Sequence, residues 1–148
     1  MQTEASPLAS SSPIRVLVVD DHHLFRTGIR ALLEVLTADA YRHLDRLNDR
    51  LLAGCEAIIR RHHLPGYAVG VGSKGCVTFS PQKIVDYETY KETQDGELAD
   101  LAWLFNMNRG IFMTPGREEE WTLSVTHTEE SVDRYVAVFE EMARDLTA

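Results

Sequence analysis

Residues 109–130 constrain the fold more than any other stretch of the sequence. They read as a short apolar strand (111–113), a Pro-Gly turn (115–116), a second strand (121–125) and a helix start near 128–130. Adjacent proline and glycine are strong turn signals, and glutamates in a first helical turn favour the positive end of the helix dipole. A strand-turn-strand-helix unit of this kind predicts a mixed α+β domain.

Three amphipathic helices are predicted around this unit. One begins at Thr37 as N-cap and ends near His63, before Pro65-Gly66, and a second covers about 98–105 and closes at Arg109-Gly110. The third is C-terminal, and its apolar residues recur every three or four positions. Its stripe is Val132, Tyr135, Val136, Phe139, Met142, Ala143 and Leu146. We therefore expect a small antiparallel or mixed sheet covered by amphipathic helices.

A glycine-rich segment lies between the first two helices. Residues 70–75 fit the dinucleotide-binding pattern G-x-G-x-x-G. That pattern binds a pyrophosphate only where a helix begins at the glycines. Residues 76–79 are strand-prone, so we expect a hairpin over 67–79 and no dinucleotide site. Residues 85–94 are polar and aromatic without clear periodicity, and no element is predicted there.

The N-terminal part has a different character. Residues 1–13 look like a flexible lead-in, 14–19 like a strand buried on both faces, and 22–33 like a helix. Residues 14–33 closely resemble the opening of a response-regulator receiver domain, in which an acidic pair binds Mg²⁺. Asp20 and Asp21 match that pair, but 58–65 lacks the acceptor aspartate of a receiver. The alternative is an acidic turn that caps the following helix. We expect strand 14–19 to join the sheet or to pair with a second copy.

From residue 36 onward the chain resembles the C-terminal small domain of class III, fold-type I aminotransferases, most closely the glutamate-1-semialdehyde 2,1-aminomutases. The resemblance is carried by N-R-G-I-F at 108–112, by Thr114-Pro115, and by S-x-x-H-T-x-x-x-x-D at 124–133. It implies helices on one face of an antiparallel sheet, in a domain that helps to cover an active site. The lysine that binds pyridoxal phosphate (PLP) and its partner aspartate are implied for a large domain that is not expected in this sequence.

One residue role follows from this resemblance. Glu119 matches an aminomutase glutamate that faces the substrate pocket, whereas the alternative for 118–120 is a solvated charged turn. His127 is expected to order its turn through hydrogen bonds. No catalytic residue is predicted, and no metal site apart from the possible Mg²⁺ pair. For this chain alone no cofactor is expected, although PLP belongs to the parent family.

We predict a composite chain of a lead-in (1–13), a receiver-like β-α fragment (14–35) and an aminotransferase small domain (36–148). A natural fusion, a rearrangement or an engineered chimera would all produce it. The predicted function is a catalytically incomplete structural or self-association module, acting as a homo-oligomer. The alternatives are a subunit of a PLP-dependent transaminase and a degenerate signalling module.

Composition limits which partners and which cellular location we expect. The net charge of −8 argues against general nucleic-acid binding, which needs clustered cations. No apolar run reaches the about 18 residues that span a bilayer, so no membrane contact is expected. Cys55 and Cys76 are too few for a disulfide framework and are expected as reduced thiols in a cytoplasmic protein.

Overall fold

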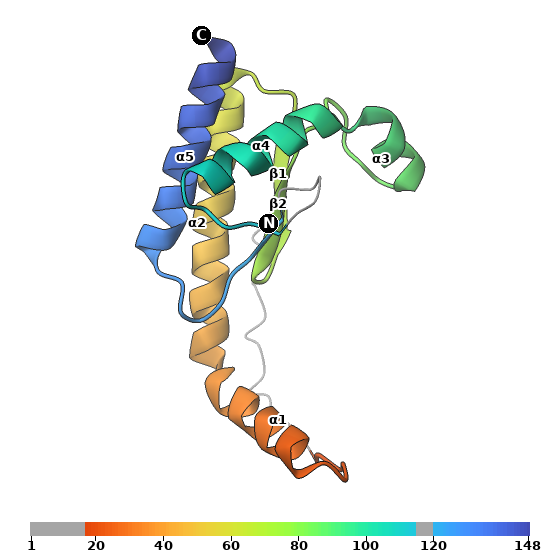
Figure 1. Cartoon of the computed structure of the whole chain (residues 1–148), viewed down its shortest axis with the longest axis vertical. Coiled ribbons are helices and arrows are strands. Elements are labelled where there is room, and N and C mark those ends of the chain that lie inside the picture. Colours follow the sequence, from red (N-terminus) through yellow and green to blue (C-terminus); the bar gives the residue numbers. More distant parts are fainter. Residues whose placement is uncertain (1–16, 115–119) are drawn as a thin grey trace, which may run out of the picture. The chain divides into compact units, whose positions relative to one another are not determined.

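The computed structural model describes residues 17–114 and 120–148, and the chain divides into two compact units, Met1–Val35 and Leu36–Ala148 (Figure 1). Among the described residues, unit 1 contains helix α1 (His23–Val35). Those of unit 2 form α2 (Ala38–His62), β1 (Tyr67–Val71), β2 (Lys74–Thr78), α3 (Tyr87–Thr93), α4 (Gly96–Asn108), β3 (Trp121–Thr122) and α5 (Glu129–Thr147). The predicted α+β class is confirmed.

The ends of α2 and α5 are set by their flanking residues. Thr37 is the N-cap of α2, where its Oγ1 accepts from the Ala40 N–H at 3.2 Å, so the predicted N-cap is confirmed. At the other end His63 adopts a left-handed conformation, with φ of 53°, and turns the chain before Pro65. Thr128 and Ser131 form a capping box at the start of α5.

The sheet of unit 2 has the order β1-β2-β3, and both strand pairs are antiparallel. The glycine-rich segment forms the predicted hairpin, with strand β2 where a dinucleotide site would need a helix. Gly75 pairs with Trp121 of β3, and the indole lies directly over it. A Cβ at Gly75 would stand only 2.5 Å from Trp121 Cζ2, so this packing requires glycine.

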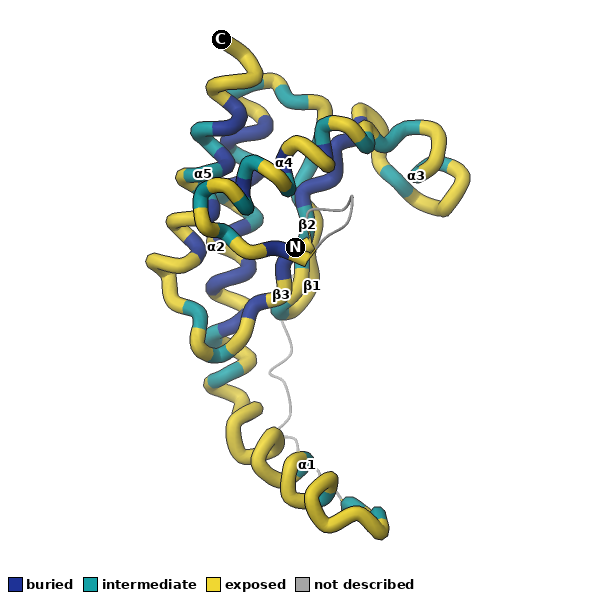
Figure 2. The backbone as a smooth tube through the Cα atoms, viewed as in Figure 1, coloured by how far each residue is buried: buried dark blue, intermediate teal, exposed yellow. Residues whose placement is uncertain are grey.

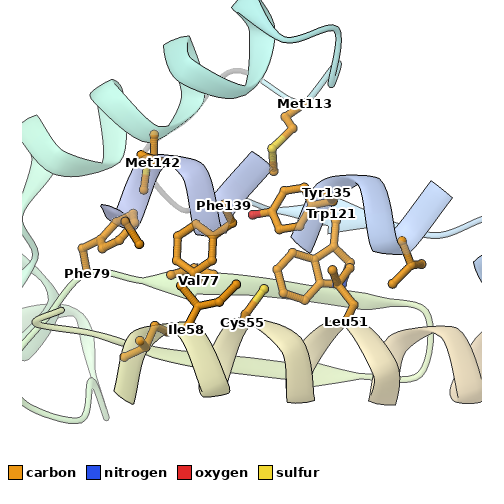
Figure 3. Close-up of a cluster of buried hydrophobic side chains, with 14 of the residues drawn as sticks. Leu51, Cys55, Ile58, Val77, Phe79, Met113, Trp121, Tyr135, Phe139 and Met142 are labelled. Carbon is orange, nitrogen blue, oxygen red and sulfur yellow. The ribbon is translucent and has the colours of Figure 1, made fainter. Parts of the chain in front are cut away.

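The core of unit 2 lies where α2 and α5 meet each other and the sheet (Figure 3). Figure 3 shows Cys55 and Ile58 of α2 opposite Val77 of β2 and Phe139 of α5. Trp121 meets Tyr135 edge-to-face, with ring centroids 5.7 Å apart. The predicted stripes of α2 and α5 are therefore largely buried; Tyr41 and Leu146, close to the outer ends of these helices, stay exposed.

Three local predictions were wrong. Residues 111–113 form no strand, because the Met113 carbonyl accepts from Trp103 Nε1 at 3.3 Å and no neighbouring strand pairs with them. Strand β3 ends at Thr122 instead of residue 125, because the Ser124 N–H donates to His127 Nδ1 and the chain turns. Helix α3 was not predicted. Its N-cap, Asp86, accepts from the Thr89 N–H at 2.8 Å, a signal present in the sequence.

In unit 1 the predicted helix is confirmed and the predicted strand is not. Residues 17–19 lie in no strand, and 14–16 lie outside the described residues. Leu17 and Val19 are 86% and 83% exposed. A strand of this apolar type is stable only between neighbouring strands and covering helices. Among the described residues those of β1, β2 and β3 are in strands, and residues 17–19 are not.

Candidate functional site

A cavity of about 410 Å³ lies in unit 2. Most of its lining residues belong to the stretch 109–130 with which the sequence analysis began. It is walled by the segment after α4, by β3 and by the first turns of α5. Polar groups on its wall come from Thr114, Glu120, Thr122, His127, Ser131 and Arg134, and apolar ones from Leu51, Ile111, Phe112, Met113, Trp121, Leu123, Val132 and Tyr135. Its size and mixed lining are those of a small-molecule site.

The β3 wall is fixed by a buried hydrogen-bond pair. Trp121 Nε1 donates to Asn48 Oδ1 at 2.8 Å, and Asn48 Nδ2 donates to the Lys74 carbonyl at 3.3 Å. Asn48 is 3% exposed and belongs to α2. The side chain therefore ties β3 and β2 to the same helix. The sequence pattern did not predict this role, because a single asparagine in an amphipathic helix is usually a surface residue.

The α5 wall begins at an ordered turn. His127 Nδ1 accepts from the Ser124 N–H at 3.0 Å, which leaves the ring proton on Nε2. The His127 carbonyl lies 2.9 Å from His43 Nε2 on α2. The prediction that His127 orders this turn is confirmed, and a metal-ligand role is not needed to explain it.

Arg109 and Arg134 support the remaining wall, which is the segment after α4. Arg109 donates from Nε and Nη2 to Glu141 at 2.9 and 2.8 Å, and its guanidinium carbon lies 3.3 Å from the Phe105 ring centroid. The hydrogen bond from Arg109 lowers the pKa of Glu141. Arg134 Nη2 donates to the Arg109 carbonyl at 3.0 Å. The Arg134 cation on the cavity wall is thus already bonded to the backbone at the end of α4.

Glu119 lies outside the described residues; its neighbour Glu120 is exposed and lines the cavity. In unit 1, Asp20 Oδ1 accepts from the His22 N–H at 2.7 Å, and the Asp20 carbonyl accepts from Arg26. These bonds order the acidic turn that precedes α1. Among residues 17–114 and 120–148, no group of three or more His, Cys, Asp or Glu could hold a metal ion.

The lysine and cysteine side chains lie outside this cavity lining. None of Lys74, Lys83 and Lys91 lines the cavity. Cys55 is fully buried in the core, and burial raises the pKa of its thiol to about 12. Cys76 is half-buried on β2, where its Sγ lies 3.5 Å from Thr78 Oγ1. No helix in the described part of the chain is long and apolar enough to cross a membrane.

Comparison with known proteins assigns relatives to this architecture. No family model matches the chain. Over 120 residues it is 27% identical to the glutamate-1-semialdehyde 2,1-aminomutase of Aquifex aeolicus, a match that covers 81% of this chain and 28% of the relative. The crystal structure of a glutamate-1-semialdehyde aminomutase from Pseudomonas aeruginosa matches 76% of the chain and 25% of its own, with a TM-score of 0.71 and 24% identity.

Two further structures extend this likeness. An omega-transaminase from Sphaerobacter thermophilus matches 82% of the chain and 27% of its own, with a TM-score of 0.66 and 21% identity. A variant of the Pseudomonas aminomutase in complex with PMP matches 92% of the chain and 32% of its own, with a TM-score of 0.77 and 21% identity. Because 92% leaves only a few residues unmatched, this likeness reaches into segment 14–35.

These comparisons cover only part of each relative. The chain spans about a third or less of the length of each relative. The match with the PMP complex includes part of segment 14–35. This chain is therefore similar to part of a glutamate-1-semialdehyde aminomutase in sequence, and to part of the solved aminomutases and of an omega-transaminase in fold.

Proposed function

We propose that this chain acts as the small domain of a PLP-dependent transaminase of the aminomutase type and is catalytically incomplete alone. The observation that carries the proposal is the origin of the cavity walls. Residues 108–133, which carry the family resemblance, also supply most of the cavity lining. One stretch of the sequence thus accounts for the resemblance and for most of the cavity wall.

The described residues do not fit PLP itself. A PLP site needs a lysine for the cofactor aldehyde and donors for its phosphate. Among the described residues no lysine lines the cavity, so none could bind the cofactor aldehyde there. The cofactor would therefore be held on a complementary large domain, and the residues described here would form one wall of the shared site.

That wall would limit the shape of the substrate and exclude water from the shared site. Trp121, Met113 and Val132 are buried behind it, so the surface is rigid and apolar at its base. Glu120 at its edge is exposed and carries negative charge next to the residue, Glu119, that the resemblance assigns to the substrate pocket. A carboxylate at this position would suit the amino group of an amino-aldehyde or amino-acid substrate.

A domain replacement tests the proposal. In the Aquifex aeolicus aminomutase, the segment that matches this chain would be replaced by residues 36–148, with the truncated enzyme as control. We expect the hybrid, and not the truncated enzyme, to bind PLP and to give its visible absorbance. A well-folded hybrid that binds no more PLP than the truncated enzyme would contradict the proposal.

The receiver-like origin of residues 14–35 and a Mg²⁺ site at Asp20 and Asp21 stay predictions. So do the composite origin of the chain and its cytoplasmic location. The bond from the His22 N–H to Asp20 supports a structural role for this turn.

A further inference from the structure

The last turns of α2 and α5 meet in unit 2, and the His62 ring of α2 bonds to both ends of the last turns of α5. Its Nε2 lies 2.8 Å from Glu140 Oε1, and its Nδ1 lies 3.1 Å from Thr147 Oγ1. The His62 side chain is only 14% exposed, whereas residues 144–147 are exposed within unit 2 (Figure 2). The His62 ring is therefore a tether for an otherwise exposed helix end.

Both ring nitrogens of His62 face an acceptor. The Glu140 carboxylate can only accept. The Thr147 hydroxyl donates its single proton to the Ala143 carbonyl at 2.9 Å, which leaves its lone pairs for His62. A neutral imidazole carries one N–H and serves one of these acceptors, whereas the imidazolium carries two. The charged ring alone satisfies both acceptors and keeps the bond from Thr147 to Ala143.

Each neutral form of the ring loses part of this arrangement. With its proton on Nδ1, the Nε2 lone pair would face the Glu140 carboxylate at 2.8 Å, which is repulsive. With its proton on Nε2, Nδ1 would accept from Thr147, whose hydroxyl would then have to release the Ala143 carbonyl. The bond to Glu140 would also weaken, because hydrogen bonds between charged groups are roughly twice as strong as neutral ones.

The two helix ends favour a positive charge at His62. Helices α2 and α5 run in the same direction, because His43 near the start of α2 contacts His127 just before α5, and His62 contacts the end of α5 (Figure 1). Their C-terminal ends therefore meet at this ring. Each such end carries partial negative charge, which stabilises a cation in the last turn.

The carboxylate of Glu140 is shared by two cations. Arg61 Nη1 donates to Glu140 Oε2 at 2.6 Å, and the hydrogen bonds from His62 and Arg61 lower the pKa of Glu140. The other cations of these last turns have partners of their own, Arg60 with Glu56 at 3.4 Å and Arg144 with Asp145 at 3.8 Å. Loss of the charge on His62 would therefore leave Glu140 with Arg61 alone.

We propose that His62 is a pH-sensitive clasp, which as an imidazolium fastens the last turn of α5 to the end of α2 and releases it when one ring proton is lost. The inference does not depend on the proposed function. Its stabilisation is fully present below about pH 6.5, where an ordinary histidine is charged, and is lost as the pH rises further. In acid it persists until Glu140 is protonated, which the lowered pKa of Glu140 delays.

Nitrogen NMR of the histidine-labelled whole chain at pH 7 tests the proposal, because the ring shifts show whether each nitrogen carries a proton. The His62 signals are those absent from the His62→Gln variant. We expect both ring nitrogens of His62 to be protonated in the folded chain, and the same ring to be mostly neutral in the chain unfolded by urea. A folded-state ring as neutral as the unfolded one would overturn the proposal.

Two variants remove the acceptors one at a time. Glu140→Gln and Thr147→Val should each lower the charged fraction of His62 at pH 7, and Arg60→Gln, which removes a nearby charge and no acceptor, should leave it unchanged. Emission of Trp103 and Trp121, both in unit 2, shows that each variant is folded. A charged fraction that neither acceptor variant lowers would overturn the proposal.

Hydrogen exchange tests the release of the helix end. After correction for the intrinsic pH dependence, the exchange rates of the amides of residues 146 and 147 should rise about tenfold between about pH 6 and pH 8 in the wild type, as a charged bond is lost. In His62→Gln they should be high at both pH values. Wild-type rates that do not rise would contradict the clasp.

Discussion

Replacement of Asn48 by alanine should destabilise unit 2 and loosen the β3 wall of the cavity. Asn48 is almost fully buried, accepts from Trp121 Nε1 at 2.8 Å and donates to the Lys74 carbonyl at 3.3 Å. A buried donor that loses its acceptor costs about 1–3 kcal/mol, and the longer second bond adds about 0.5 kcal/mol. We therefore expect the free energy of unfolding to fall by about 1.5–3.5 kcal/mol.

A double-mutant cycle isolates the Asn48–Trp121 interaction. Trp121→Phe removes the indole N–H but keeps an aromatic ring against Tyr135. The double variant carries both Asn48→Ala and Trp121→Phe. Urea unfolding followed by far-UV circular dichroism measures all four proteins with the same signal. We expect a coupling energy of about 1–2 kcal/mol. A loss below about 0.5 kcal/mol for Asn48→Ala, or strictly additive effects, would refute the account of the anchor.

Four further predictions concern other parts of the molecule. Gly75→Ala should lower the free energy of unfolding by about 1–3 kcal/mol in the same urea assay, because its Cβ would overlap the Trp121 indole; an unchanged midpoint would show that the ring moves freely. The His62 ring, with Arg61, lowers the pKa of Glu140. A lowered folded-state pKa gives stability that is present above the unfolded pKa and lost as pH falls, so Glu140→Gln should flatten the loss of thermal stability in mildly acidic buffer, and an unaltered pH profile would contradict this. Iodoacetamide should modify Cys76 in the native protein well before Cys55, whose thiol has a pKa of about 12 and is fully buried; peptide mass mapping that finds the reverse order would argue against this core. If Asp20 and Asp21 only cap α1, their amide NMR signals should show no saturable shift with Mg²⁺ at millimolar levels, whereas a saturable shift would support the receiver-like site.

Periodicity predicted the parts of this fold that depend on burial. The stripes of α2 and α5 are wide and regular, and the break at Thr37 follows from one capping side chain. Residues 67–79 were predicted as a hairpin because the residues after the glycines favour a strand. In each case the local signal and the tertiary packing favour the same structure.

The failures have a common physical cause. Residues 17–19 and 111–113 have strand composition, but a strand exists only when another strand pairs with it, and pairing is not a local property. Helix α3 was missed because its one strong signal, Asp86 bonded to Thr89, is a cap without an apolar stripe behind it.

The candidate site was only partly foreseen. The sequence pointed to the right stretch and to the role of His127, since both depend on residues close together in the chain. Asn48 and the Arg109–Glu141 pair were missed, because their partners lie on separate elements far apart in sequence. Whether Glu119 faces a substrate remains a prediction of the family resemblance.

The central claim is that this chain has the small-domain fold of an aminotransferase without a cofactor site of its own. The most direct measurement is the visible absorption spectrum of the purified chain during a titration with PLP, before and after borohydride reduction. The account predicts only the spectrum of free PLP and no specifically labelled lysine. A saturable aldimine band that disappears when Lys74, Lys83 or Lys91 is replaced by alanine would contradict it.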